Sequence, residues 1–341
     1  MTIKFPPPLR PGDTIGVTAP SSGVGGPFRP RMEHAMEGLR KRGYEVRLGE
    51  CFYGGGVTSA PAADRAAELM DMMTDPAVRA VVPPWGGVVG IDLLHLLDFE
   101  ALAADPTWLV GYSDTSTLTF PLTVLGGVAA LHGSNLAETP FEPPLPLRHW
   151  LDMVSAEPGA TIKQGAAPAY KEHGWDDFRA HPSISEFALH SPNEWKWLDG
   201  EGDVEISGRL VGGCLETVAN LAGTPFGDVA AFAANHAPDG LIIHLEASEA
   251  DSDEVARRLW GLRLAGWFDR ANAVIIGRTR GSGSEQLSQH DAVRHCLGDL
   301  GIPIVADVEV GHVAPFMPLV EGSQATLRHG TAGSSITQTL A

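Results

Sequence analysis

A short β-branched run, Asp13-Thr14-Ile15-Gly16-Val17-Thr18-Ala19, stops at Pro20-Ser21-Ser22-Gly23, and an amphipathic stretch follows at about 29–42. β-Branched residues favour strands, and apolar residues that repeat every 3.6 positions indicate a helix. Proline and glycine between the two mark a loop. The segment therefore predicts a strand, a loop and a helix.

The same alternation of strand and helix recurs to about residue 111. Predicted strands lie at 45–48, 80–82 and 108–111, and predicted helices lie at about 62–73 and 91–97. Repeated strand–helix units form a parallel sheet with helices on its faces, and the loops at the carboxyl ends of the strands carry the chemistry. Residues 1–165 are therefore predicted to form an α/β domain.

The second half of the chain begins with a stretch that has no sustained period. It runs from about 141 to 202 and is rich in Pro, His, Trp and Gly, and we interpret 166–205 as a linker or insertion. Regular patterns return at 208–213. They continue as a helix to about 221, a strand at 240–245, a helix at 252–264, strands at 273–277 and 303–308, and a hairpin at 325–340. Residues 206–341 are therefore predicted to form a mixed α+β domain.

The composition excludes several classes of partner. A chain of 341 residues is long enough for two domains. Its formal charge of −18, from 42 acidic and 24 basic residues, repels phosphate backbones and anionic lipids, so we expect no nucleic-acid and no membrane partner. The N-terminus lacks the apolar segment of a signal peptide, and no apolar run is long enough to span a bilayer, which predicts a cytoplasmic protein.

Cysteine and histidine spacing gives no sign of a metal site. Cys51, Cys214 and Cys296 are far apart and match no paired spacing, so we expect free thiols in a reducing compartment. His290 and His295 are five residues apart on a predicted helix and would not share a face. The sequence therefore predicts no metal ligands.

The most distinctive local motif is Trp108-Leu109-Val110-Gly111-Tyr112-Ser113-Asp114-Thr115, an apolar strand followed by Gly-x-Ser and a predicted helix. A serine on a tight strand-to-helix turn is exposed beside the free N–H groups of the helix start, which suits a nucleophile. The alternative is a serine that caps the helix. Thr115 stands where the hydrolase elbow Gly-x-Ser-x-Gly has its second glycine.

A nucleophilic serine needs a base, and the base needs a carboxylate that orients it. His312 follows an apolar strand in a loop rich in Gly and Pro, and Glu246 ends another apolar strand, where a buried carboxylate requires a partner. These two residues are the candidates for base and orienting acid. The alternatives are a loop histidine and a strand-end acid that binds backbone amides.

Six motifs occur in order along the chain. They are Ile15-Gly16-Val17-Thr18-Ala19-Pro20-Ser21-Ser22, Trp85-Gly86-Gly87, Gly111-Tyr112-Ser113-Asp114, Gly208-Arg209-Leu210-Val211-Gly212-Gly213, Leu245-Glu246, and Gly311-His312 followed by Pro318-Leu319. With these motifs the chain resembles the serine peptidase family that contains the LD-carboxypeptidases and the microcin C self-immunity peptidases. The resemblance implies a flavodoxin-like N-terminal domain with a parallel sheet, a swivelling mixed α+β C-terminal domain and a homodimer.

The resemblance also implies a Ser-Glu-His triad that needs no metal and no cofactor. Motif by motif, it puts the nucleophile at Ser113, the orienting carboxylate at Glu246 and the base at His312. It puts the oxyanion hole at backbone N–H groups of Asp114 and of the Gly86-Gly87 turn, where glycine lets the backbone approach a substrate.

Two positions depart from the family pattern. Family members often carry Arg before the first glycine pair and Asn after the second, and this chain has Trp85 and Cys214 there. Neither position belongs to the implied triad. The departures therefore put the contacts to substrate in doubt, and not the chemistry.

The resemblance implies hydrolysis of an amide through an acyl-enzyme, on a small peptide or on a peptidyl- or aminoacyl-nucleotide. LD-carboxypeptidases remove the terminal D-alanine of a murein tetrapeptide during peptidoglycan recycling, and the immunity branch cleaves the amide that joins a peptide or amino acid to a nucleotide-like toxin. The stretch 143–202 resembles the enlarged loop of the immunity branch, and we lean toward that branch. Its tryptophans are Trp175, Trp195 and Trp197.

We predict substrate contacts for Trp85, Trp195 and Trp197, because an aromatic ring can stack on a base. The alternative is that the loop tryptophans pack the insertion onto its own domain. Two other classes are weighed against the peptidase: an α/β-hydrolase-type esterase, which shares the order Ser, acid, His, and a non-catalytic two-lobed ligand-binding protein.

Overall fold

Strand β1 (Thr14–Val17) lies inside a six-stranded sheet in the computed structural model, which describes residues 2–341. The sheet has the order β14-β5-β4-β3-β1-β2. Strands β2 (Glu45–Leu48), β1, β3 (Val78–Val81), β4 (Trp108–Gly111) and β5 (Leu131–His132) are parallel. Their order 2-1-3-4-5 is that of flavodoxin-like folds, so the predicted N-terminal architecture is confirmed.

Helices α1 (Arg29–Lys41), α2 (Ala62–Thr74), α3 (Phe99–Ala104) and α4 (Ser116–Val124) connect these strands. In α1 the buried residues Met32, Ala35, Met36 and Leu39 follow the spacing i, i+3, i+4, i+7, which gives the helix one apolar stripe. All four residues of β4 are buried, as expected for a central strand with helices on both faces. Hydrophobic burial therefore sets the layers of this domain.

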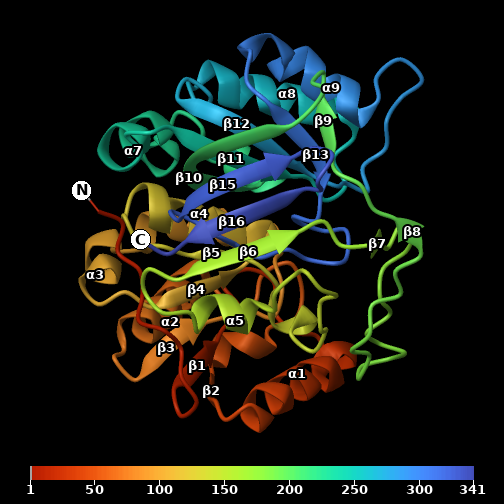
Figure 1. The fold of residues 1–341 in the computed structure, drawn as a ribbon. Coiled ribbons are helices and arrows are strands. Elements are labelled where there is room, and N and C mark those ends of the chain that lie inside the picture. Colours follow the sequence, from red (N-terminus) through yellow and green to blue (C-terminus); the bar gives the residue numbers. More distant parts are fainter. Residues whose placement is uncertain (1) are drawn as a thin grey trace.

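A second sheet has eight strands in the order β6-β16-β15-β10-β11-β12-β13-β9. Its parallel part consists of β10 (Val204–Cys214), β11 (Leu241–Glu246), β12 (Ala271–Gly277) and β13 (Ile304–Val308). The antiparallel strands β15 (Gln324–His329) and β16 (Ser335–Thr339) form the expected C-terminal hairpin. Helices α6 (Leu215–Val218), α7 (Val229–His236), α8 (Ser252–Leu264) and α9 (Gln289–Leu297) belong to this domain, and α8 and α9 lie over its outer face (Figure 1).

The stretch at 141–202, which has no sustained period, contributes two strands to the second sheet. Strand β6 (Thr161–Gly165) pairs with β16, and β9 (Lys196–Leu198) pairs with β13. Both edges of the second sheet thus come from the stretch that was assigned to the end of the first domain and to the insertion. Edge strands of three to five residues with mixed polarity leave little periodic signal, which explains the discrepancy.

One strand crosses in the other direction. Strand β14 (Leu319–Val320) pairs with β5 in the first sheet, although the chain on both sides of it belongs to the second. The boundary predicted near residue 165 therefore does not follow the sheets. The chain passes between the two domains several times.

The remaining elements are short. Helix α5 is Trp150–Val154, and β7 (Ala169–Tyr170) pairs with β8 (Ser191–Pro192) as a separate ribbon at the side of the molecule (Figure 1). Short 3-10 helices are η1 (Gly26–Phe28), η2 (Glu50–Tyr53), η3 (Gly90–Leu96), η4 (Ser113–Thr115), η5 (Leu136–Glu138), η6 (Ala219–Leu221), η7 (Pro225–Gly227) and η8 (Gly298–Leu300).

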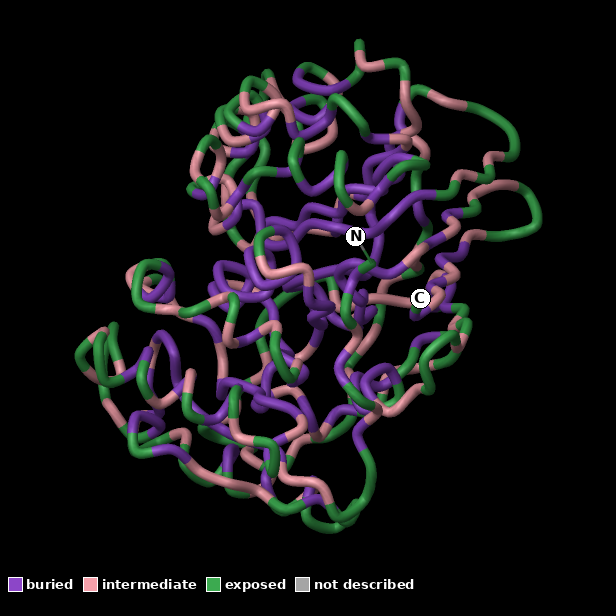
Figure 2. Tube along the Cα trace, turned by 90° about the vertical axis from the view of Figure 1, so that its left-hand side faces the viewer, coloured by how far each residue is buried: buried purple, intermediate pink, exposed green. Residues whose placement is uncertain are grey.

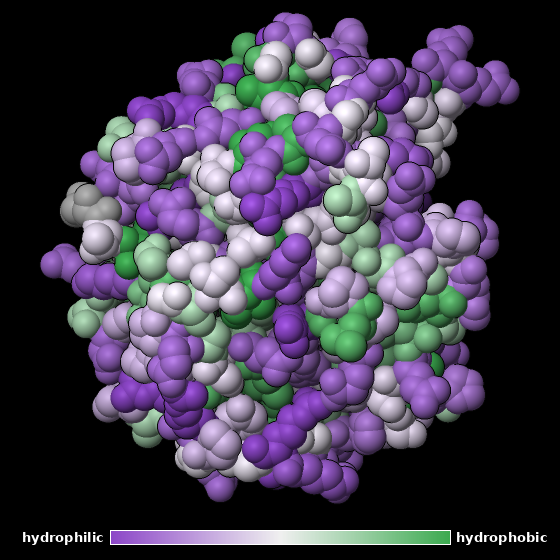
Figure 3. Space-filling view, in the orientation of Figure 1, coloured by the Kyte–Doolittle hydropathy of each residue, from purple (hydrophilic) through white to green (hydrophobic). Residues whose placement is uncertain are grey.

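Buried residues run through the centre of the molecule, where the two domains meet, and exposed residues lie in the outer loops (Figure 2). The surface in Figure 3 is mostly hydrophilic, with apolar residues in small separate patches. Within residues 2–341, no helix combines the length and apolarity that crossing a membrane requires.

Candidate active site

Ser113 lies at the carboxyl end of β4, where the strand turns into η4 and then α4. Its φ angle is 62°, in the left-handed region, which costs a residue with a side chain about 1–2 kcal/mol. Strain of this kind persists where the surrounding structure fixes the turn, and it is a feature of the nucleophile elbow. The geometry therefore favours the nucleophile over the simple helix cap, since no side-chain cap bond starts η4 or α4.

The Asp114 carboxylate holds the Ser113 turn in place through two hydrogen bonds. This buried carboxylate accepts hydrogen bonds from Ser21 Oγ at 2.6 Å and from the Gly90 N–H at 2.8 Å. Ser21 belongs to the loop after β1, and Gly90 starts the turn η3 that follows β3. One carboxylate thus ties together three loops at the carboxyl edge of the first sheet.

Gly86 and Gly87 are glycines because the backbone passes very close to this turn. A β-carbon on Gly86 would lie 2.8 Å from Ser113 Oγ and 2.9 Å from the backbone nitrogen of Asp114. Gly87 has φ +149°, and a β-carbon there would lie 2.2 Å from Ser21 Oγ. The Gly86-Gly87 turn therefore borders the same small space as Ser113.

Glu246 and His312 form a buried pair in the second domain. His312 Nδ1 lies 2.7 Å from Glu246 Oε2, and the two residues are 7% and 1% exposed. Gly311 makes room for the pair, since a β-carbon on it would lie 2.2 Å from Glu246 Oε2. A proton on Nδ1 is held by the carboxylate, which leaves Nε2 as the basic nitrogen.

Burial and the charge of Glu246 have opposite effects on the pKa of His312. Burial lowers the pKa of His312, but the charge of Glu246 and its hydrogen bond outweigh burial and raise that pKa above its ordinary value. The imidazole is thereby a stronger base than a free histidine.

Tyr112 brings the two halves together. It precedes Ser113 in the first domain, and its ring centroid lies 4.8 Å from that of His312 in the second. The turn that carries Ser113 therefore lies next to the His312–Glu246 pair at the domain boundary.

Glu138 is a residue that the sequence analysis missed. It ends η5, after β5, and its Oε2 is buried without a hydrogen-bond partner within residues 2–341. Burial outweighs the charge of Arg31 and raises the pKa of Glu138 to about 7, and its charge contributes to the raised pKa of His312. The position of Glu138 shortly after a strand of the parallel sheet is the sequence feature from which it could have been predicted.

The three predicted substrate-contacting tryptophans take different positions. Trp85 is partly buried, donates from Nε1 to the Ser22 carbonyl at 3.0 Å and packs edge-on against Phe28. Trp195 is only 2% exposed and donates to Glu309 Oε2 at 2.6 Å, so it has almost no surface to offer a ligand.

Trp197 lines a surface pocket with Gly301 and Pro303, at the amino end of β13, whereas His312 follows its carboxyl end. The structure therefore does not bring Trp195 and Trp197 to Ser113. Their packing agrees with the alternative in which loop tryptophans bind their own domain.

Trp175 is the loop tryptophan that does reach the site. It is 54% exposed, its ring lies edge-on to His312 with centroids 6.4 Å apart, and the Arg280 guanidinium stands 4.6 Å from its ring centroid. The predicted substrate contacts, Trp195 and Trp197, came from the same loop but did not include Trp175.

A cavity of about 330 Å³ opens behind Glu246, at the carboxyl ends of β11 and β12. Its walls are apolar toward α8 and α9, and Lys196, Arg278 and His290 lie around Asp307 at its polar side. Burial opposes ionisation of Asp307, but hydrogen bonds from His290 and Lys196 and the charge of Arg278 lower its pKa to about 2.

Two groups of potential metal ligands occur within residues 2–341. One is Cys214 with Glu246 and His312, and the other is His132, His244 and Glu321, with candidate ligand atoms within 4.8 Å of one another in each group. In the first group the two candidate catalytic residues are already hydrogen-bonded to each other. The second group lies outside the site and is taken up below.

Comparison with known proteins matches both domains. The family model for the LD-carboxypeptidase N-terminal domain matches residues 15–133, and that for the LD-carboxypeptidase C-terminal domain matches residues 207–327. A putative carboxypeptidase of Vibrio cholerae is 28% identical, over 94% of this chain and 93% of its own. The microcin C7 self-immunity protein MccF of Escherichia coli is 25% identical, over 97% of this chain and 95% of its own.

The fold has a close counterpart among solved structures. The structure of MccF in complex with glutamyl sulfamoyl guanosine superposes with a TM-score of 0.82 at 22% identity, and covers 98% of both chains. The likeness thus extends over both domains and the segment between them. With the two domain matches in order along the sequence, the chain belongs to the LD-carboxypeptidase family of peptidases.

Proposed function

We propose that the chain is a serine peptidase that cleaves an amide through an acyl-enzyme, with Ser113 as nucleophile, His312 as base and Glu246 as the orienting acid. The observation that carries the proposal is the buried His312–Glu246 pair, at 2.7 Å, facing the strained turn of Ser113 through Tyr112. Family membership supports peptidase activity. The triad assignment rests on this geometry and on the resemblance described above.

In the proposed reaction, His312 Nε2 takes the proton of Ser113 Oγ while the oxygen bonds to the amide carbonyl carbon. Backbone N–H groups of Asp114 and of the Gly86-Gly87 turn stabilise the oxyanion. His312 then gives its proton to the leaving nitrogen as the carbon–nitrogen bond breaks. A water molecule, deprotonated by His312, releases the acyl group as a carboxylic acid and restores Ser113.

The proposed substrate is an aminoacyl- or peptidyl-nucleotide, and the murein tetrapeptide is the second candidate. The exposed face of Trp175 beside His312 favours the first, because a flat aromatic surface next to the catalytic base can stack on a nucleobase. The MccF structure holds such a conjugate, glutamyl sulfamoyl guanosine. The family name supports the second candidate.

A paired cleavage assay tests the proposal. Purified protein is incubated with an aminoacyl-sulfamoyl adenosine and with murein tetrapeptide, and Ser113→Ala serves as the blank. Release of the nucleotide or of D-alanine, absent in the blank, supports a serine peptidase and identifies the branch. Full activity of Ser113→Ala would contradict the nucleophile assignment.

A fluorophosphonate probe separates the peptidase from the two-lobed binding protein, because only an activated serine reacts with the probe. We expect labelling of the wild type at Ser113 and none of Ser113→Ala. The esterase alternative finds no support in the sheet order, which divides the strands between two sheets.

A further inference from the structure

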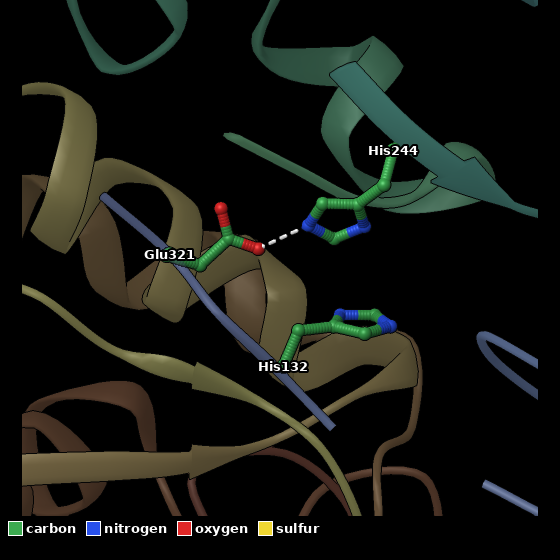
Figure 4. A group of neighbouring side chains, drawn as sticks. All are labelled: His132, His244 and Glu321. Carbon is green, nitrogen blue, oxygen red and sulfur yellow. Dashed lines mark hydrogen bonds and ion pairs between the residues drawn. The ribbon is translucent and has the colours of Figure 1, made fainter. Parts of the chain in front are cut away.

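A second cluster of titratable side chains lies between the two sheets, next to the candidate active site. His132 ends β5, His244 lies in β11, and Glu321 follows β14, and their exposures are 1%, 0% and 0% (Figure 4). His244 Nε2 lies 2.5 Å from Glu321 Oε1, and Glu321 Oε2 accepts the Gly212 N–H at 3.0 Å. The ring of His132 lies edge-on to that of His244, with centroids 5.0 Å apart.

This cluster joins the two sheets. His132 belongs to the first sheet and His244 to the second, and Glu321 follows the strand that crosses from one to the other. Ser116 extends the connection: its Oγ lies 3.5 Å from His132 Nδ1 and accepts the Cys214 N–H at 3.1 Å. Ser116 begins the helix that follows the Ser113 turn.

The cluster lies close to the triad, on a shared strand in one case and on a neighbouring strand in another. His132 pairs with Gly111, two residues before Ser113. His244 lies two residues before Glu246 on β11, so their side chains point to the same face of the sheet. The Tyr112 ring lies near both the cluster and the triad. Its centroid is 6.3 Å from that of His132 and 4.8 Å from that of His312.

Directional bonds in a buried site fix positions more sharply than apolar packing does. Removing one partner of a buried ion pair costs about 3–5 kcal/mol, whereas replacing both partners by apolar residues is often neutral for stability. Burial, followed by the charges of His244 and His312, lowers the pKa of His132 well below its ordinary value, so its ring is neutral. Such a pair contributes geometry rather than net stability.

We infer that His132, His244 and Glu321 are positioning residues, which set the register of Ser113 in the first domain against His312 and Glu246 in the second. The inference rests on the proposed function. None of the three touches the reacting atoms in the mechanism given above. They act through the strands that carry the triad.

A bound metal ion is the competing explanation for two histidines and a glutamate. Zinc binds nitrogen and oxygen ligands at about 2.0–2.2 Å in tetrahedral geometry. Two ligand atoms of the same zinc ion are therefore more than about 3 Å apart. His244 Nε2 and Glu321 Oε1 are closer than that, at 2.5 Å. A direct hydrogen bond therefore accounts for the pair.

The test replaces both members of the pair at once. The double variant His244→Leu with Glu321→Leu removes both partners of the pair and leaves only the Gly212 N–H without its acceptor, so it is expected to fold with some loss of stability. We expect kcat to fall about 10- to 100-fold with KM within about threefold of the wild type, the size of effect that a misplacement of about 1 Å produces. Labelling by the fluorophosphonate probe should slow by a similar factor.

Two further variants separate positioning from general stability. Glu321→Gln keeps an oxygen that accepts the Gly212 N–H, and its NH2 group donates to His244 Nε2 when the imidazole carries its proton on Nδ1, so this variant is expected to recover most of kcat. Thr107→Val removes another buried hydrogen bond, from Thr107 Oγ1 to the Val78 carbonyl, at the opposite end of β4, and should lower stability while kcat stays unchanged.

An unchanged kcat in the folded double variant overturns the inference, and so does an equal loss in Thr107→Val. Stoichiometric zinc in the purified wild type, with activity lost on chelation, overturns it in favour of a metal site. Crystal structures of the wild type and the double variant provide a readout that needs no activity: an unchanged distance from Ser113 Oγ to His312 Nε2 overturns positioning. A wild type that neither cleaves nor labels overturns the proposed function instead.

Discussion

Gly86 and Ser113 are in such close contact that a single methyl group on Gly86 would reach 2.8 Å from Ser113 Oγ. They come from loops after neighbouring strands of the first sheet, β3 and β4. Because Gly86 has no side chain, only backbone atoms border Ser113 on this side. An oxyanion hole made of N–H groups requires such an arrangement. The first prediction tests this contact.

Gly86→Ala should lower kcat by about 10²–10³-fold, the cost of losing an oxyanion-hole donor, because its methyl group displaces either the turn or the Ser113 side chain. Steady-state kinetics measure the loss. Gly38→Ala is the matched control: Gly38 lies in α1 with nothing within 4 Å of the added carbon. That variant should keep full activity and gain about 0.5–1 kcal/mol of stability.

Ser113→Gly should be more stable than the wild type and inactive. Glycine accepts a φ of 62° without the cost that a β-carbon incurs, so we expect a gain of about 1–2 kcal/mol in the free energy of unfolding. Ser113→Ala should be equally inactive without that gain. Denaturant unfolding of both variants, beside the wild type, measures the difference, and equal stabilities would argue against backbone strain at Ser113.

The pH dependence of activity should reflect His312. Because its pKa is raised, kcat/KM should rise with pH through an inflection above about 6.5, the ordinary histidine value. Glu138→Gln removes a negative charge that stabilises the imidazolium, so the inflection should move to lower pH. An inflection that stays in place would exclude electrostatic coupling between Glu138 and His312.

Glu138 should also make stability depend on pH. Its pKa is raised to about 7 in the folded protein, so the folded state holds the proton more tightly than the unfolded state does. The resulting stabilisation is present below about pH 4.5 and is lost as pH rises through about 7, by up to about 1.4 kcal/mol per pH unit. Urea unfolding between pH 4.5 and 8 should show a smaller decline for Glu138→Gln than for the wild type.

Trp175→Ala should raise KM for an aminoacyl-sulfamoyl adenosine by about tenfold or more, since stacking of a base on an aromatic ring contributes about 1–3 kcal/mol. KM for murein tetrapeptide, which has no base, should change little. Trp197→Ala is the control from the same segment, because Trp197 lies at the amino end of β13. Equal effects of the two substitutions would remove the stacking role.

The strand and helix periods predicted much of the first domain, because buried strands such as Trp108–Gly111 and amphipathic helices such as Arg29–Lys41 carry strong apolar patterns. Strand β2 at Glu45–Leu48 and helix α8 at Ser252–Leu264 have the predicted bounds. Strands β6, β9 and β14 were missed, since a strand of two to five residues is held by its neighbours rather than by its own sequence.

Some residues of the candidate site could be predicted from the sequence, and others could not. Ser113, Glu246 and His312 lie at strand ends, where the topology of a parallel sheet concentrates functional residues, so the sequence offered them as candidates and the family resemblance joined them into a triad. Trp175 and Glu138 depend on how a loop folds back and how deeply a side chain is buried. Neither property has a periodic signature, and so both residues needed the structure.

The crossing of β14 into the first sheet has a consequence for synthesis of the chain. The edge partner of β5 is residues Leu319–Val320, and His312 precedes them by only a few positions. Nearly the whole polypeptide must therefore be synthesised before the first sheet is complete, and the same last segment carries the proposed base, His312. We therefore expect chains that end before this segment to lack both the edge strand of the first sheet and the proposed peptidase activity.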